Sequence, residues 1–200
     1  MKTIKIWNEN PSEKQIVEIC DDLRKGSIMI CPTDTVYGIM CDAMNVKAVE
    51  RICNLKRINP AKTNLSIICD SISMASEYSK IDNRMFRLIK ENTPGAFTFL
   101  LPANSRLPRT FRGRKNVGVR IPDNNICRRI SESLEGPLLT TSIEFDDEDH
   151  AVNPDLIYDN YNALADLMVE GNEGKAEFST IVDCTGDEPE IIRNGLGKIE

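Results

Sequence analysis

The chain has 200 residues, of which 40% are hydrophobic and 28% charged, and its formal net charge is −6 at pH 7. This length and composition are typical of one globular domain with a core of useful size. No apolar run approaches the ~18 residues of a transmembrane helix, and the first residues lack the apolar core of a signal peptide. We therefore expect a cytoplasmic protein with no membrane partner.

The cysteines and the histidine exclude several kinds of site. The seven cysteines are odd in number, none is spaced C-x-x-C, and most lie in apolar runs. This pattern predicts reduced thiols that pack as small hydrophobes, and it argues against a disulfide scaffold or a zinc site. His150 is the only histidine and lies in an acidic stretch, so we interpret it as a solvated surface residue. We predict no metal site and assign no catalytic nucleophile.

The first half of the chain alternates between strand-like and helix-like periods of apolar residues. Asn10 as cap, with Pro11 at the first helical position and Glu13 as capping-box acid, predicts a helix that Gly26 ends. Further helices should follow a cap at Asn45, lie within 70–79, and follow a cap at Asp82. The helix after Asn45 should bury Val46 and Ile52, and the helix after Asp82 should bury Phe86 and Ile89. Strands are predicted at 3–7, 27–31, 39–41, 65–69 and 96–101.

The second half continues the alternation. Asp123 should cap a helix that Gly136 ends, and a weaker helix is expected near 154–160. Strands are predicted at 116–121, 138–143, 167–170, 179–183 and 191–193. This order indicates an α/β fold in a single domain spanning residues 1–200. Some strands are separated by too few residues for a crossover helix, so the sheet should mix parallel and antiparallel strands.

Polar side chains follow the apolar strand at 27–31. The stretch Cys31-Pro32-Thr33-Asp34-Thr35-Val36-Tyr37-Gly38 places two hydroxyls, a carboxylate and a phenol between a proline that ends the strand and a glycine that permits a turn. Polar groups at the end of a buried strand often bind a ligand. From the residues alone, a ligand-binding turn and a plain structural turn fit this stretch equally well.

Basic residues are concentrated in one part of this acidic chain. Residues 92–122 include no acidic residue, and an acidic cluster follows at 144–149. The basic residues of this window are Arg106, Arg109, Arg112, Arg114, Lys115 and Arg120. A local basic segment favours an anionic ligand, and a solvated basic loop is the alternative.

The chain has neither of the common glycine-rich phosphate loops. Both the G-x-x-x-x-G-K-[ST] and the G-x-G-x-x-G patterns are absent. A bound nucleotide would need side chains and turn amides to hold its phosphates. Candidates are Lys56, Arg57, Lys62 and Arg120. Thr140 and Ser142 share one face of their predicted strand and can also reach a ligand.

Five segments, in order, resemble the YrdC-like superfamily, which includes threonylcarbamoyl-AMP synthases. Residues 32–38 (P-T-D-T-V-Y-G) resemble its P-T-[ED]-T-x-Y-G signature. The segments at 93–98, 117–122, 179–183 and 191–195 resemble its P-G-x-x-T, V-x-V-R-x-P, S-T-[IV]-[IV]-D and x-x-R-x-G patterns. They extend over about residues 11–197, and the chain is identified as a member of this superfamily with particular likeness to the YciO branch.

The resemblance implies a YrdC-like fold, with a twisted mixed sheet around a large basic cavity. It implies a reaction that joins L-threonine, bicarbonate and ATP, with Mg²⁺, to give L-threonylcarbamoyl-AMP and pyrophosphate for a modified adenosine of tRNA. No tightly bound cofactor is expected. The alternative is a protein that binds tRNA or double-stranded RNA without adenylation. The sequence does not predict an oligomeric state.

The resemblance also implies roles for individual residues. Contacts to threonine or bicarbonate are implied for Thr35, Arg120, Ser142 and Ser179. Contacts to the nucleotide are implied for Arg57, Asn59, Asn116, Thr140, Ser142 and Arg193. The RNA contacts would be Arg106, Arg109, Arg112, Arg114 and Lys115.

The chain departs from the synthase pattern at three positions. Asn59 stands on the arginine of the K-x-R motif, and Asn116 stands where a threonine is usual. Glu144 replaces the asparagine of the S-x-N motif, and a carboxylate that faces a triphosphate would repel it. The YciO branch departs from the synthases in the same two motifs, K-x-R and S-x-N.

Overall fold

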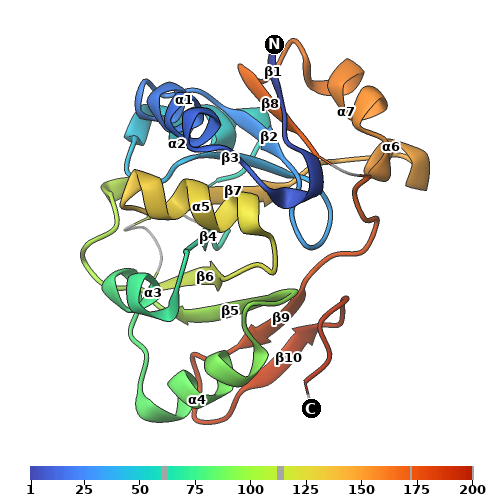
Figure 1. The fold of residues 1–200 in the computed structure, drawn as a ribbon. Helices are drawn as coiled ribbons and strands as arrows, with labels where there is room; N and C mark the ends of the chain where they lie inside the picture. Colours follow the sequence, from blue (N-terminus) through green and yellow to red (C-terminus); the bar gives the residue numbers. More distant parts are fainter. Residues whose placement is uncertain (60–62, 112–114, 172, 200) are drawn as a thin grey trace.

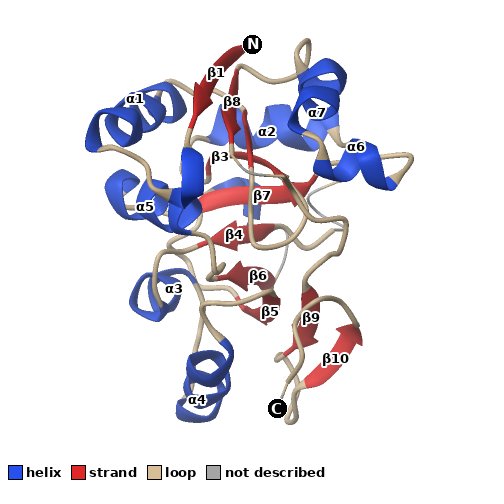
Figure 2. Ribbon diagram, turned by 45° about the vertical axis from the view of Figure 1, so that its right-hand side comes forward, coloured by secondary structure: helices blue, strands red, loops and turns tan. Residues whose placement is uncertain are grey.

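The structure is a computed structural model that describes residues 1–59, 63–111, 115–171 and 173–199. Within these residues the strands form one sheet of ten, in the order β1-β8-β2-β3-β7-β4-β6-β5-β9-β10. The sheet extends from β1 near the N-terminus to the β9–β10 pair near the C-terminus, and helices flank it (Figure 1, Figure 2). The strands are β1 (Lys2–Lys5), β2 (Met29–Cys31), β3 (Gly38–Asp42), β4 (Ser66–Ile68), β5 (Phe97–Pro102), β6 (Asn116–Arg120), β7 (Leu138–Ser142), β8 (Leu167–Glu170), β9 (Thr180–Asp183) and β10 (Glu190–Arg193).

The predicted α/β class and mixed sheet are confirmed. Strand pairs β1–β8, β2–β8, β4–β6 and β5–β9 are parallel, whereas β2–β3, β3–β7, β4–β7, β5–β6 and β9–β10 are antiparallel. The helices are α1 (Glu13–Arg24), α2 (Val46–Leu55), α3 (Ile72–Tyr78), α4 (Asn83–Asn92), α5 (Asn125–Leu134), α6 (Glu148–Val152) and α7 (Pro154–Tyr161), with short 3₁₀ turns η1 (Trp7–Glu9) and η2 (Arg109–Phe111).

Two apolar layers hold helices on opposite faces of the sheet. Side chains alternate between the faces along a strand, so Met40 of β3 joins the cluster under α1 and α5, whereas Ile39 and Cys41 join the cluster under α2. Helices α1 and α5 pack together and cover only part of their face. Further along the same face, towards β6, β5 and β9, the sheet carries polar residues in place of apolar ones.

Helix α1 begins two residues later than the sequence predicts. The capping residue is Ser12, not Asn10. Its Oγ accepts a hydrogen bond from the N–H of Gln15 at 3.3 Å, and the Gln15 side chain accepts from the Ser12 N–H at 2.9 Å. This reciprocal pair satisfies two free backbone donors, which one asparagine cap cannot do. The predicted end of the helix is confirmed, with Gly26 at a φ of 97°.

Helix α5 is capped by Asn124 and not by Asp123. The backbone N–H of Asp123 instead donates to Oδ2 of Asp34 at 3.0 Å. A contact between residues so far apart in the chain has no signal in the local sequence. It ties the start of α5 to the turn between β2 and β3, and that turn leads to the site described below.

Some predicted inward residues face solvent. Ile52 and Ile89 are buried, but Val46 and Phe86 are exposed. Both lie at the edge of their helix's apolar face, and that face is narrower in the fold than its sequence pattern suggests. Helix α6 was not predicted. It forms because Asp147 caps it, its Oδ1 accepting from the N–H of His150 at 3.0 Å.

The chemistry expected of the cysteines agrees with the fold. All seven are free and buried. Among the described residues, no helix has the length and apolar character to cross a membrane, and no group of acidic, histidine or cysteine side chains is placed to hold a metal.

Candidate functional site

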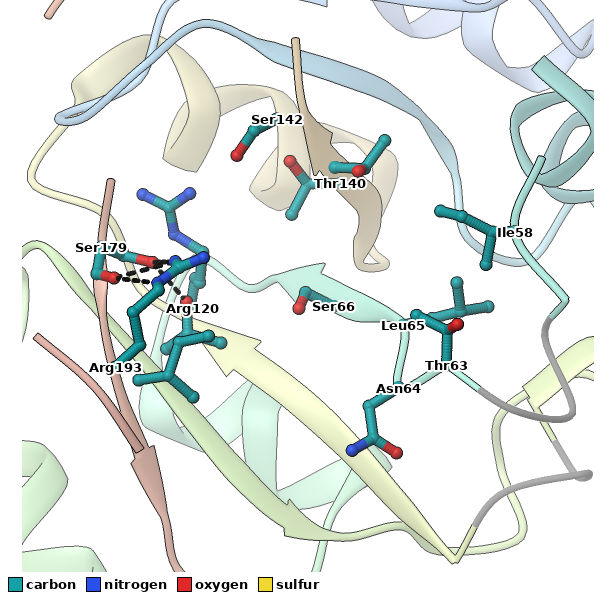
Figure 3. Close-up of a pocket in the computed structure, with 13 residues that line it drawn as sticks. Ile58, Thr63, Asn64, Leu65, Ser66, Arg120, Thr140, Ser142, Ser179 and Arg193 are labelled. Atoms are coloured by element: carbon teal, nitrogen blue, oxygen red, sulfur yellow. Dashed lines mark hydrogen bonds between the residues drawn. The ribbon is translucent and has the colours of Figure 1, made fainter. Parts of the chain in front are cut away.

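A cavity of about 220 Å³ lies on the polar part of the sheet. Arg120, Arg193 and Ser179 gather at one end of it, and Ile58, Thr63 and Leu65 lie at the other (Figure 3). The residues that line it are Ile58, Thr63, Asn64, Leu65, Ser66, Thr98, Arg120, Thr140, Thr141, Ser142, Ser179, Ile181 and Arg193. The cavity therefore joins a cationic end to a smaller, partly apolar end.

The floor of the cavity is a row of small residues on neighbouring strands. Ser66 of β4 pairs with Thr140 of β7 on one side and with Gly118 of β6 on the other. A Cβ added to Gly118 would lie 2.4 Å from Oγ of Ser66 and 3.1 Å from Cγ2 of Thr98 on β5. Only glycine at this position lets the hydroxyls of Ser66, Thr98 and Thr140 line one continuous surface.

The turn at residues 31–38 positions Arg120 at the cationic end of the cavity. Arg120 is 6% exposed, and its Nη2 donates to Oδ1 of Asp34 at 2.8 Å and to Oγ1 of Thr35 at 2.9 Å. Oγ1 of Thr33 in turn lies 3.0 Å from Oγ1 of Thr35. Thr35 therefore positions Arg120 and does not itself line the cavity.

One donor of Arg120 has no partner within the described residues. Its Nε is buried and makes no hydrogen bond there. A buried donor without a partner is costly, so this donor lowers the stability of the site as it stands.

Arg193 forms the second cationic group. Its Nε and Nη2 donate to the carbonyl oxygen of Ser179 at 3.0 and 2.8 Å, and Nη2 also donates to the Ser179 Oγ at 3.0 Å. That hydroxyl lies 2.8 Å from Oγ1 of Thr98, and the Phe178 ring lies 5.4 Å from Cζ of Arg193. Burial, followed by the nearby charge of Arg120, lowers the pKa of Arg193 below its usual value. Two guanidinium groups so close together favour an anion between or beside them.

The structure brings together five of the residues that the sequence predicts for substrate and nucleotide contacts. Arg120, Thr140, Ser142, Ser179 and Arg193 all line the cavity. They come from β6, β7, the residue before β9, and the end of β10, so the sheet converges on one site from segments far apart in the chain.

Other predicted contacts lie elsewhere. Arg57 and Asn59 are exposed in the segment after α2 and do not line the cavity. Asn116 begins β6, at the opposite end of that strand from Arg120. Lys62 lies outside the described residues.

Of the predicted RNA contacts, Arg106 and Lys115 have described side chains, and neither lines this cavity. Arg106 pairs with Glu77 at 2.8 Å and its guanidinium lies 5.8 Å from the Tyr78 ring centroid. Lys115 is exposed, and Arg109 belongs to η2. Arg112 and Arg114 lie outside the described residues. RNA binding by this segment stays a prediction.

Sequence reasoning assigned no role to several residues of the site, among them the polar residues Asp34, Thr98 and Ser66. Asp34 and Thr98 lie within the segments that resemble the superfamily, so their position carried a signal. Ser66 is a single polar residue at the start of an apolar strand. Such a residue usually marks only the end of the strand, so it gave no indication of a site.

Fold and cavity together define an α/β protein whose mixed sheet carries a polar cavity with two arginines at one end. A family model described as "Telomere recombination", for the Sua5, YciO and YrdC proteins, matches residues 21–195. The chain therefore belongs to the Sua5/YciO/YrdC family.

Particular relatives place it more closely. It is 34% identical over 202 residues to the uncharacterized protein YciO of Escherichia coli K12, covering 98% of this chain and 96% of that protein. It is 31% identical over 204 residues to a Methanocaldococcus jannaschii protein named as a candidate threonylcarbamoyl-AMP synthase, covering 100% of this chain and 95% of that protein.

Solved structures agree. The crystal structure of E. coli YciO matches with a TM-score of 0.91 at 32% identity, covering 100% of this chain and 98% of that chain. The P. abyssi Sua5 structure complexed with L-threonine matches with a TM-score of 0.85 at 25% identity, covering 98% of this chain and 58% of that longer chain.

Proposed function

We propose that this protein is a threonylcarbamoyl-AMP synthase-like enzyme that joins L-threonine, bicarbonate and ATP. The observation that carries the proposal is the convergence of Arg120, Arg193, Ser179 and Ser142 on one cavity. Two relatives support it, the M. jannaschii protein by its name and P. abyssi Sua5 by its complex with L-threonine.

The reaction suits a site without a nucleophilic side chain. The amine of threonine and bicarbonate condense to a carbamate with loss of water. A carbamate oxygen then attacks the α-phosphorus of ATP, and pyrophosphate leaves. All of these reactants are anionic, so the protein acts by positioning them and by offsetting their charge.

The cavity residues divide this work. The guanidinium groups of Arg193 and Arg120 line the cavity and offer positive charge to a carboxylate or carbamate. The hydroxyls of Ser142, Thr140 and Ser179 can orient the same ligand. No acidic residue lines the cavity among the described residues, so Mg²⁺ would arrive with the phosphates of ATP and not be held by the protein.

The test is threonine-dependent release of pyrophosphate. Purified protein with ATP and bicarbonate should release pyrophosphate only when L-threonine is present. Ser179→Ala removes a hydroxyl that bonds both Arg193 and Thr98, and we expect kcat/KM for threonine to fall by ~10–100-fold. Ser76→Ala, at an exposed hydroxyl on α3, is the matched control and should leave the rate unchanged. Absence of threonine-dependent pyrophosphate at high enzyme concentration would reject the synthase.

A further inference from the structure

An ion pair stands beside the cavity at the position where the chain departs from the synthase pattern. Nζ of Lys56 lies 2.6 Å from Oε1 of Glu144 and donates to the carbonyl oxygen of Ser142 at 3.1 Å. The Lys56 side chain is 10% exposed and the Glu144 side chain 78% exposed. The lysine is thus fixed in the wall, and its counter-ion reaches out from that wall into solvent.

This pair lies next to the cavity, because the carbonyl oxygen that accepts from Lys56 belongs to Ser142. Ser142 lines the cavity, and on the other side of the segment 142–144 a second cavity of about 330 Å³ is lined by Lys56, Glu144 and Phe145. The first cavity, at about 220 Å³, is smaller than the roughly 300 Å³ at which pockets for drug-sized ligands begin. A nucleotide bound at Arg120 and Arg193 would extend beyond it, and Lys56, which bonds to Ser142 of the first cavity, lines the second.

The charges around the first cavity are nearly balanced. Arg120 is paired with the buried carboxylate of Asp34 at 2.8 Å, and Lys56 is paired with Glu144. Among the described residues that line the cavity, Arg193 is the only cation that forms no ion pair. The site therefore offers about one uncompensated positive charge to its ligand.

We propose that Glu144 is a specificity-determining residue that neutralises Lys56 and so weakens the binding of polyphosphate ligands, including the ATP of the proposed reaction, relative to a single phosphate. The inference deepens the proposed function, on which it rests for the identity of the site. The cavity accepts a carboxylate or a single phosphate, because Arg193 balances one charge. A triphosphate brings several charges, and the cation that would meet them next, Lys56, is already occupied.

The repulsion is readily removed because Glu144 is exposed. Glu144 is 78% exposed, and Lys56 keeps its hydrogen bond to the carbonyl oxygen of Ser142, so Glu144→Gln should fold as the parent does and leave Lys56 in place. The released ammonium group is then a free phosphate partner at the wall of the cavity.

The experiment measures affinity for a series of ligands that differ in charge and require no catalysis. Inorganic phosphate, pyrophosphate, tripolyphosphate and ATP are titrated by calorimetry into the parent, Glu144→Gln and Asp146→Asn. Asp146 is an exposed carboxylate that lines the same second cavity, so it controls for a general change in surface charge. The double variant Lys56→Met/Glu144→Gln tests whether any gain passes through Lys56.

We expect Glu144→Gln to tighten tripolyphosphate and ATP by about tenfold and inorganic phosphate by less than about threefold, because repulsion grows with ligand charge. Asp146→Asn should change the affinity for each ligand by less than about twofold. The double variant Lys56→Met/Glu144→Gln should bind tripolyphosphate and ATP no more tightly than the parent. Equal effects of Glu144→Gln and Asp146→Asn, a gain that persists without Lys56, or no binding of any of these anions would overturn the inference.

These outcomes are separate from those of the proposed function. Charge selection by Glu144 without threonine-dependent pyrophosphate would reject the synthase and keep the inference. Threonine-dependent pyrophosphate release with no effect of Glu144→Gln on polyphosphate affinity would keep the synthase and reject the inference.

Discussion

The buried pair between Arg120 and Asp34 should dominate the response of this protein to single substitutions in its site. The two side chains are 7% and 5% exposed, and the joined atoms are 2.8 Å apart. Asp34→Asn keeps the side-chain volume and one oxygen acceptor but leaves the Arg120 charge buried without its counter-ion. Removing one partner of a buried pair costs ~3–5 kcal/mol. We therefore expect Asp34→Asn to lower the free energy of unfolding by this amount.

Urea unfolding followed by circular dichroism measures this free energy. Arg120→Met should cost a similar amount, because it leaves the carboxylate of Asp34 unpaired. The double variant should cost clearly less than the sum of the two, since it leaves neither charge alone. Glu13→Gln breaks an exposed pair with Arg129 at 2.9 Å and should cost less than ~1 kcal/mol. A cost of Asp34→Asn below ~1 kcal/mol, or additive costs in the double variant, would refute the reasoning.

Three further predictions concern the sheet, the thiols and the single histidine. Gly118→Ala places a Cβ 2.4 Å from Oγ of Ser66 and should cost ~1–3 kcal/mol, whereas Gly186→Ala, where the nearest atom lies at 3.9 Å, should change stability by less than ~0.5 kcal/mol in the same urea assay. All seven cysteines are buried, and burial raises the pKa of thiols such as Cys184, to about 11. Ellman's reagent should therefore label none in the folded protein and all after unfolding, and a fast-reacting thiol would contradict the packing. The hydrogen bond that His150 Nδ1 donates to Oδ1 of Asp147, at 2.7 Å, raises the pKa of His150 above 6.5. Its contribution to the stability of α6 is present below pH 6.5 and is lost as pH rises through the raised folded-state pKa. NMR titration of His150, the only histidine, should show a lower pKa in Asp147→Asn than in the parent. An unchanged pKa would mean that Asp147 does not cause the raised value.

Local patterns predicted most of the elements. The apolar period and the caps at Asn45 and Asp82 led to α2 and α4 where they occur, because these signals act within one turn of a helix. The cap at Asp123 was wrong because the helix begins one residue later, where the Asn124 side chain accepts from the N–H of Cys127. The Asp123 N–H donates to Asp34, and no local pattern carries a contact between segments so distant in the chain.

The site divides in the same way. Arg120, Ser142, Ser179 and Arg193 were predicted from the segments that carry them, and they do share a cavity. Arg57 and Asn59 were predicted only from their alignment with the K-x-R motif, and they do not line the cavity. The sequence showed Glu144 as a departure from the S-x-N motif. It did not show that Lys56 is its partner, because the two residues meet only at the end of β7 in the folded chain.

The sequence by itself determined the strand and helix order, the reduced cysteines, the family, and several of the residues that line the cavity. These properties depend on apolar period, composition and short motifs, all of which are local. Only the tertiary structure decided how the charges combine. It placed Asp34 and Thr35 behind Arg120, Ser179 under Arg193, and Glu144 against Lys56. Electrostatic balance depends on distances between side chains from different strands, and those distances exist only after the sheet has formed.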